Sequence, residues 1–329
     1  MSAFDAVRLA RAIERFEAEA GRDGARRLAI LHRGDLVHAG PEADRAQGVW
    51  SITKTILSTT LGLLVDDGRV ALDQPVTRVL PELAAAFSDA TFRHFASMTS
   101  GYRAIGDEAP IKGYAHGPSR SFMQPAPTPQ SAPGTTFSYW DSAPNMLALA
   151  LTRVAGEPLA HLLRRRILEP LGIDLEWGAF LVDGQRVHGG AGNHFGTVQI
   201  SCLDLCRLGE LYRCQGLWHG HRLLSADWCA AATSVQVPAG LALHETPFDG
   251  RGCYGFFWWV NGVTASGARK WPGVEAGAYS ASGYNNNDLF VLPEEELVVC
   301  RLGHDQDFDG AIVDDTYAAL LNGIVAARS

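Results

Sequence analysis

Between Trp50 and Gly68 the hydrophobic residues are spaced too densely for a helix that lies on the surface. They occupy most of a helical wheel, at Ile52, Ile56, Leu57, Leu61, Leu63, Leu64 and Val65. A helix that is apolar nearly all round is a buried one. Asp66-Asp67-Gly68 supplies a turn and a glycine suited to the left-handed residue after a helix. The pattern therefore predicts a buried helix that begins at Ser51.

Strand-like patterns lie towards the two ends of the chain, and helical patterns fill its middle. Strands are predicted over residues 27–32, 36–39, 254–260, 278–282 and 288–302, the first two forming a hairpin and the last being a hairpin that turns at 293–296. Helices are predicted over residues 6–20, 91–98, 141–154, 158–167, 201–214 and 314–328. This order predicts one sheet domain with a helical insertion.

Composition and charge narrow the class of protein. The chain has 329 residues, of which 47% are hydrophobic and 19% charged, a globular composition with ample core. The net charge is −8 and the basic cluster 164–166 fits one solvated helix face, so nucleic acid is not an expected partner. No apolar run reaches membrane-spanning length, and residues 1–21 lack the apolar core of a signal peptide. We therefore expect a cytoplasmic protein that binds no membrane.

The cysteines give no sign of a metal site. There are six, and they form no C-x-x-C pair and no zinc spacing. Buried thiols are the expectation for all of them, with neither a metal nor another cofactor.

The predicted helix start carries the first candidate chemistry. Ser51 stands where backbone N–H groups are free and the helix dipole is positive. Lys54 is the only charge between Ser51 and Val65, and a spacing of three residues brings it to the same helix face. A desolvated lysine has a lowered pKa and can act as a base, and a hydroxyl beside it becomes a nucleophile. The alternative for the pair is a helix-capping serine and a lysine that extends to the surface.

A second candidate segment, residues 133–142, precedes another predicted helix. Tyr139 on such a loop can take the serine proton if a cation lies near its phenol. The alternative is structural: Asp141 or Ser142 caps the following helix, and Tyr139 packs in the core. The preceding stretch, 100–136, is rich in glycine, proline and serine, and loops of that length are typical of functional sites.

Several motifs occur in a fixed order along the chain. They are Ser51-Ile-Thr-Lys54, Gly62-Leu-Leu-Val-Asp-Asp-Gly68, Leu72-Asp-Gln-Pro-Val76, Leu80-Pro-Glu82, Thr91-Phe-Arg-His-Phe-Ala-Ser-Met-Thr-Ser-Gly101, Pro133-Gly134, Tyr139-Trp-Asp141, Tyr254-Gly-Phe-Phe-Trp-Trp-Val-Asn261 and the last hairpin. From residue 27 to the end, this series resembles the serine β-lactamase-like superfamily, with its class C β-lactamases, DD-peptidases, family VIII carboxylesterases and 6-aminohexanoate-dimer hydrolases. No Gly-x-Ser-x-Gly elbow occurs, which disfavours an α/β-hydrolase.

The resemblance implies an α/β (α+β) fold of the β-lactamase/transpeptidase type: an antiparallel sheet flanked by helices, plus an inserted, mainly helical domain. We expect the sheet domain at 1–75 and 215–329, the helical domain at 76–214, and the active site between them. In the family pattern Ser51 matches the acylated nucleophile, Lys54 its base partner, and Tyr139 the residue that passes the proton to the leaving group. The oxyanion hole would combine the Ser51 N–H with one from the third-motif strand.

Two positions depart from the family pattern. Asp141 stands where relatives have the Asn of Tyr-x-Asn. An ionised carboxylate can only accept hydrogen bonds. We therefore expect Asp141 either to hold Lys54 charged or to bind a cationic or N–H group of a substrate. The third motif, Lys-Thr-Gly or His-x-Gly in relatives, aligns with Ala281-Ser282-Gly283 and offers no cation for a substrate carboxylate. The Tyr284 N–H then becomes the second oxyanion donor. The other expected substrate contacts are Trp50, Ser282, Gly283 and Asn285.

These residues predict a serine hydrolase that forms an acyl-enzyme with a small-molecule ester or amide and needs no cofactor. The oligomeric state stays open, and so do three alternatives: an acyltransferase with the same site, an enzyme of the β-lactamase or DD-peptidase type, and a catalytically idle ligand-binding homologue. Residues 305–310 resemble half of a calcium loop, but its twelfth position is Thr316 and not Glu. A polar loop that caps the last helix is expected there instead.

Overall fold

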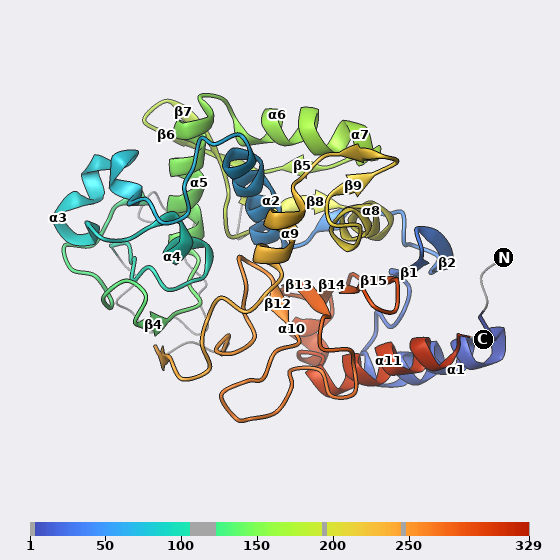
Figure 1. The fold of residues 1–329 in the computed structure, drawn as a ribbon. Coiled ribbons are helices and arrows are strands. Elements are labelled where there is room, and N and C mark those ends of the chain that lie inside the picture. Colours follow the sequence, from blue (N-terminus) through green and yellow to red (C-terminus); the bar gives the residue numbers. More distant parts are fainter. Residues whose placement is uncertain (1–3, 106–122, 193–195, 245–247, 329) are drawn as a thin grey trace.

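A six-stranded antiparallel sheet lies at the centre of the molecule (Figure 1). The computed structural model describes residues 4–105, 123–192, 196–244 and 248–328. The strand order is β12-β13-β14-β15-β1-β2, so the N-terminal hairpin is joined edge to edge to the C-terminal strands. The strands are β1 Leu28–His32, β2 Asp35–Ala39, β12 Trp259–Val260, β13 Tyr279–Gly283, β14 Asn287–Leu292 and β15 Leu297–Arg301.

The middle strands are buried along their whole length. Every residue of β14 and of β15 is buried, and most of them are valine, leucine or phenylalanine. A strand covered on both faces reads as a continuous apolar run, because neither side of it meets water. The pairing of β1 with β15 runs from Leu28 opposite Arg301 to His32 opposite Leu297.

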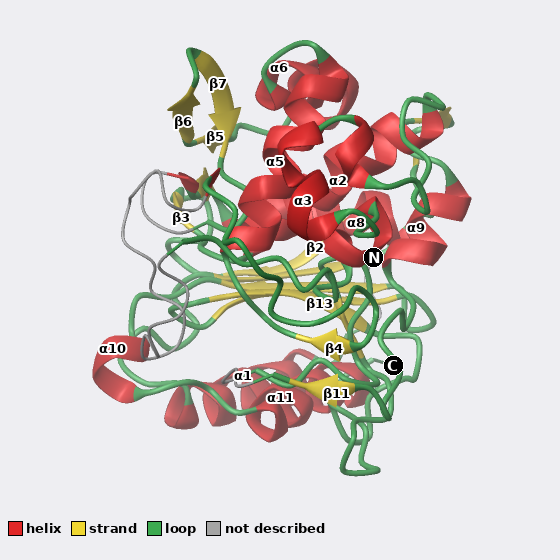
Figure 2. Cartoon of the chain, turned by 90° about the vertical axis from the view of Figure 1, so that its left-hand side faces the viewer, coloured by secondary structure: helices red, strands yellow, loops and turns green. Residues whose placement is uncertain are grey.

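Helices cover both faces of the sheet (Figure 2). On one face α1 (Ala6–Glu19) packs along α11 (Asp314–Ala326), and on the other lie α2 (Ile52–Asp66) and α8 (Cys202–Arg213). Phe290 of β14 packs on Tyr317 of α11 with 5.0 Å between ring centroids. Although α8 belongs to the range expected as the helical domain, it contacts β1, β14 and β15. The division into two domains at the stated residues stays a prediction.

Further elements complete the described part of the chain. The other helices are α3 Ala84–Phe87, α4 Phe92–Ala96, α5 Ser142–Ala155, α6 Leu159–Leu163, α7 Glu169–Leu171, α9 Ala226–Ala232 and α10 Gln306–Asp309, with 3-10 helices at Val76–Arg78 and Pro81–Leu83 and a π-helix at Arg164–Leu168. The other strands are β3 Gln47–Gly48, β4 Thr136–Phe137, β5 Glu176–Trp177, β6 Ala179–Val182, β7 Gln185–His188, β8 Val198–Ile200, β9 Leu217–Trp218, β10 His221–Arg222 and β11 Ala242–Leu243.

None of the described helices is by itself long and apolar enough to cross a membrane. One pair, Ser142–Ala155 with Leu159–Leu171, meets the length and composition requirements together, but it is bent by 70°.

The predicted fold class is confirmed, and one predicted strand is wrong. Of residues 254–260 only Trp259–Val260 is a strand, because the segment doubles back at Phe257, whose φ is +61°. The carbonyls of Phe256 and Phe257 turn towards α2, where they accept hydrogen bonds from Ser58 Oγ at 2.7 Å and Thr55 Oγ1 at 2.9 Å. The aromatic run therefore packs on the buried helix as a turn. Part of the expected loop 100–136, residues 106–122, lies outside the described residues.

A buried ion pair fixes the turn between β13 and β14. Arg301 and Asp305 are both fully buried, and Arg301 Nη2 lies 2.5 Å from Asp305 Oδ2. Arg301 Nη1 donates to the carbonyl of Asn286 at 3.0 Å, and the Asn286 amide donates to Asp305 Oδ1 at 2.9 Å. The segment that resembled half of a calcium loop thus supplies the counter-ion of an arginine, and the arginine holds the turn after Gly283.

Replacing Arg301 by methionine should lower the free energy of unfolding by about 3–5 kcal/mol, because it leaves the Asp305 carboxylate buried without a cation. Urea denaturation of the variant measures the loss. The double variant Arg301→Met/Asp305→Asn removes both charges and should recover part of it. A single variant as stable as the wild type would show that the pair does not fix this turn.

Candidate active site

Ser51 occupies the N-cap position of α2, yet its side chain makes no capping hydrogen bond. An N-cap serine ordinarily accepts from a backbone N–H of the first turn. Here the amides of Ile52 and Lys54 donate to backbone carbonyls at 3.2 and 3.0 Å. The Ser51 hydroxyl instead accepts from Lys54 Nζ at 2.7 Å. The capping alternative for Ser51 is therefore wrong. Trp50, just before it, has a φ of +50°, an uncommon conformation for a bulky residue.

Lys54 is 1% exposed, and its ammonium has three hydrogen-bond acceptors. Nζ donates to Ser51 Oγ at 2.7 Å, to Asp141 Oδ1 at 2.9 Å and to the carbonyl of Ala191 at 3.1 Å. Burial lowers the pKa of Lys54, but the carboxylate of Asp141 and the phenol of Tyr139 raise it, and the net shift is upward. The lowered pKa expected for a desolvated lysine does not occur, whereas the expected contact of Asp141 with a charged Lys54 does. Lys54 is therefore charged at neutral pH, and its ammonium donates a hydrogen bond to the Ser51 hydroxyl.

Asp141 reaches this ammonium from the N-cap position of α5, where it is 2% exposed. Its side chain makes no capping hydrogen bond, so the capping alternative is wrong here as well. The same helix fixes the third acceptor, because Asn145 Oδ1 accepts from the N–H of Gly190 at 2.8 Å, next to Ala191. α5 therefore supplies the counter-ion of Lys54 and anchors the segment that carries its other acceptor.

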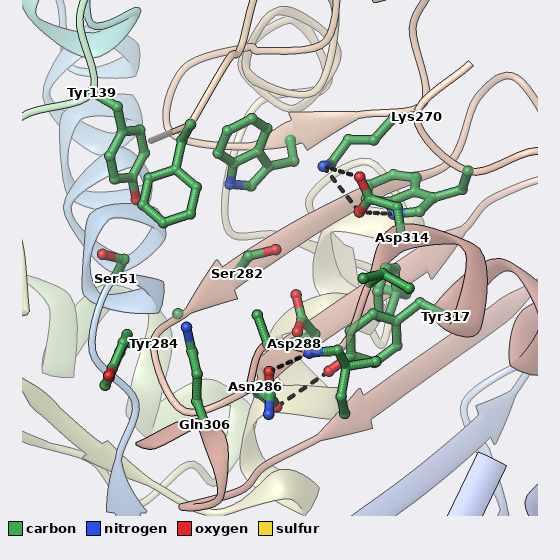
Figure 3. A pocket seen from close by; sticks show the side chains of 18 of the residues that line it. Ser51, Tyr139, Lys270, Ser282, Tyr284, Asn286, Asp288, Gln306, Asp314 and Tyr317 are labelled. Carbon is green, nitrogen blue, oxygen red and sulfur yellow. Dashed lines mark hydrogen bonds and ion pairs between the residues drawn. The ribbon is translucent and has the colours of Figure 1, made fainter. Parts of the chain in front are cut away.

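Tyr139 presents its phenol to the same site. The ring is 4% exposed and packs against Phe248 and Trp259, with centroid distances of 5.2 and 5.8 Å. Lys54 Nζ lies 4.8 Å from the centre of the ring. In Figure 3 the hydroxyl points towards Ser51. Packing in the core and proximity to the site, which the sequence left as alternatives, occur together.

The end of β13 passes directly beside the start of α2. A Cβ atom on Gly283 would lie 2.2 Å from the carbonyl oxygen of Val49 and 3.2 Å from the backbone nitrogen of Ser51. Any side chain at this position would therefore push the strand away from Ser51. The next residue, Tyr284, packs its ring on that of Trp50 with 5.3 Å between centroids.

A cavity of about 430 Å³ opens beside Ser51 (Figure 3). Its wall includes five of the residues expected from the sequence: Ser51, Tyr139, Ser282, Gly283 and Tyr284. Four others are not in the wall: Lys54 and Asp141, which are buried next to Ser51, and Trp50 and Asn285. Asn286, not Asn285, faces the cavity from the turn.

Other wall residues were not found from the sequence, among them Lys270, Asp288, Asp314 and Tyr317. One signal was available for Asp288, since it is the only charged residue of its strand and pairs with Ser282 in the hairpin register. No local pattern marks Lys270, which arrives from a loop. Among the described residues no group of three or more His, Cys, Asp or Glu side chains is arranged to hold a metal ion.

The sequence matches the model of the Beta-lactamase family over residues 9–323, and the chain belongs to this family. It is 24% identical to the 6-aminohexanoate-dimer hydrolase of Paenarthrobacter ureafaciens over 305 residues, which are 84% of this chain and 70% of that protein. Esterase EstB of Burkholderia gladioli is 30% identical over 141 residues, 37% of this chain and 36% of the esterase.

Solved structures show the same fold. EstCE1, described as a hydrolase with promiscuous acyltransferase activity, superposes with a TM-score of 0.72 at 18% identity, covering 97% of this chain and 99% of its own. At this identity the likeness establishes the fold, and the named relatives in the sequence comparison are hydrolases.

Replacing Asp141 by asparagine should move the acid limb of the pH–rate profile to lower pH. The carboxylate raises the pKa of Lys54, so its loss makes Lys54 easier to deprotonate. The shift should be up to about one pH unit for each 1.4 kcal/mol of interaction lost. The profile of kcat/KM for an ester measures it. Asp249→Asn is the control, since Arg251 holds that carboxylate, and an unmoved profile in Asp141→Asn would remove Asp141 from the proton chemistry.

Proposed function

We propose that the protein is a serine hydrolase that cleaves an ester or a small amide through an acyl-enzyme on Ser51. One observation carries the proposal: the Ser51 hydroxyl lies 2.7 Å from a buried ammonium at the wall of a cavity. Membership of the Beta-lactamase family supports it, as do relatives named as an amide-dimer hydrolase and an esterase.

The charge on Lys54 assigns the proton transfers to Tyr139. A charged ammonium has no lone pair and cannot accept a proton, but in the proposed mechanism it stabilises both a Tyr139 phenolate and the oxygen of Ser51. In the proposed mechanism the phenolate accepts the Ser51 proton as Oγ attacks the substrate carbonyl. The phenol then donates that proton to the leaving group, and the acyl-enzyme forms. In the second half of the reaction Tyr139 takes a proton from water as the water oxygen attacks the acyl carbon. Tyr139 then returns the proton to Ser51, and the carboxylic acid is released.

Two backbone amides are proposed to bind the developing oxyanion, those of Ser51 and Tyr284. The close approach of Gly283 to the Ser51 nitrogen supports this pairing, because it brings the end of β13 beside the nucleophile. Two aligned N–H donors are what acyl transfer requires, and losing one such donor typically costs about 100- to 1,000-fold in kcat. An alcohol or amine in place of water would give acyl transfer from the same intermediate, and EstCE1, which shares the fold, is described as having such an activity.

Ser51→Ala should lower the hydrolysis of p-nitrophenyl butyrate by at least about a thousandfold, since the variant has no nucleophile to acylate. Circular dichroism and thermal unfolding check that the fold is retained. Ser58→Ala is a matched control on the same helix, because its hydroxyl binds the carbonyl of Phe256 and does not face the cavity. Wild-type turnover in Ser51→Ala would refute the assignment of the nucleophile.

Penicillins and cephalosporins should be poor substrates compared with short-chain esters. The third-motif strand offers Ala281-Ser282-Gly283 and no cation, and Lys270 in the same cavity is paired with Asp314 at 2.9 Å. A β-lactam carboxylate would therefore lose its hydration without gaining a charged partner. Nitrocefin and p-nitrophenyl butyrate assayed side by side test this point. A higher kcat/KM for nitrocefin would contradict it and favour a β-lactamase.

A further inference from the structure

The cavity contains a buried carboxylate for which the proposed mechanism has no use. Asp288 lies on β14 directly opposite Ser282 of β13, and its side chain lines the cavity beyond Ser51 (Figure 3). It is 8% exposed, in a strand whose other residues are also buried. Isolated carboxylates are costly to bury, so such a group needs a positive partner or stays protonated.

Within the described part of the chain, no arginine, lysine or histidine forms an ion pair with Asp288, because the nearby cations are held by other carboxylates. Lys270 binds Asp314 at 2.9 and 3.0 Å. Arg301 lies opposite Asp288 in the neighbouring strand, but its guanidinium binds Asp305. Asp249, another acidic residue of the cavity wall, binds Arg251 at 2.7 Å.

The groups that do interact with Asp288 are the hydroxyls of Ser282 and Tyr317. Burial raises the pKa of Asp288 to about 7, with these hydroxyls opposing the rise, Asp314 adding to it and Lys270 opposing it. The carboxyl group of Asp288 therefore gains or loses its proton near neutral pH. Binding of a cation would favour the ionised form and lower this pKa.

We propose that Asp288 binds a cationic nitrogen of the substrate, so that the enzyme prefers esters or amides that carry an alkylammonium group. The inference rests on the proposed function and names its substrate class. A carboxylate and two hydroxyl oxygens give an ammonium group negative charge and acceptors at one place. The aromatic wall of the cavity can also face a cation, as Trp259 does with Lys270 Nζ, which lies 4.7 Å from its ring centre.

Matched pairs of esters test the preference. For a cation on the acyl side, p-nitrophenyl 4-(trimethylammonio)butyrate is compared with p-nitrophenyl 5,5-dimethylhexanoate, which has the same shape and no charge. For a cation on the leaving group, butyrylcholine is compared with 3,3-dimethylbutyl butyrate. The quaternary nitrogen keeps its charge at every pH, so any pH dependence of the charged-to-neutral ratio of kcat/KM comes from the protein, and effects on Ser51 cancel in the ratio.

In one of the two pairs the ratio should exceed unity by about tenfold at pH 8, the equivalent of about 1.4 kcal/mol, and should fall towards pH 6 as Asp288 takes up its proton. Asp288→Asn should bring the ratio close to unity at both pH values while the neutral ester is still hydrolysed. Asp249→Asn removes the same formal charge from the cavity wall and should leave the ratio high. Thermal unfolding of each variant checks the fold.

A wild-type ratio near or below unity in both pairs would overturn the inference. So would an Asp249→Asn variant that lowers the ratio as much as Asp288→Asn does, because the preference would then come from the overall electrostatic field of the cavity and not from Asp288. Calorimetric binding of butyltrimethylammonium to the wild type and to Asp288→Asn tests the same site without turnover. Binding that needs Asp288, in an enzyme that hydrolyses none of the esters, would support this inference and count against the proposed function. Hydrolysis of the esters without such binding and without a preference for the charged esters would support the proposed function and count against this inference.

Discussion

The ammonium of Lys54 must find all of its hydrogen-bond acceptors inside the protein, because it is 1% exposed. Its acceptors come from three separate segments: the start of α2, the start of α5 and the loop at Ala191. Removing one partner of a buried ion pair typically costs about 3–5 kcal/mol, so the charge constrains where these segments lie relative to one another. The same constraint orients Ser51, since its hydroxyl is one of the acceptors. The packing of these segments and the proposed reactivity of Ser51 therefore depend on one group.

A second constraint brings the sheet to this group. Gly283 permits β13 to pass within contact of the Ser51 nitrogen, and the buried Arg301–Asp305 pair holds the turn that follows. Arg301 lies at the end of β15, which pairs with β1 near the N-terminus. The geometry of the proposed oxyanion hole thus depends on contacts between the two ends of the sequence, far from the nucleophile along the chain.

Whether the sequence could predict a feature of the fold or the site depends on how far apart along the chain the interacting residues are. Ser51 and Lys54 are three residues apart on one helix, so the helical period brings them together, and the ordered motifs predicted Tyr139 and the fold. The apolar surroundings of Lys54 alone predict a lowered pKa. The upward shift depends on Asp141, 87 residues further on, which only the departure from Tyr-x-Asn indicated as a partner of Lys54. Asp288 could have been found from the hairpin register. Lys270 could not, since its loop has no periodicity, and the aromatic run at 254–260 was misread because a turn packed on α2 has the composition of a strand.

The central claim is that Ser51 is a nucleophile made reactive by the buried ammonium. Incubation with a fluorophosphonate, followed by peptide mass spectrometry, tests it most directly. The account predicts a single stoichiometric adduct on Ser51 in the wild type. It also predicts labelling at least about a hundredfold slower in Lys54→Met/Asp141→Asn, where both buried charges are removed together so that neither is left unpaired. An unlabelled wild-type protein, an adduct on another serine, or equal labelling of the double variant would contradict the claim.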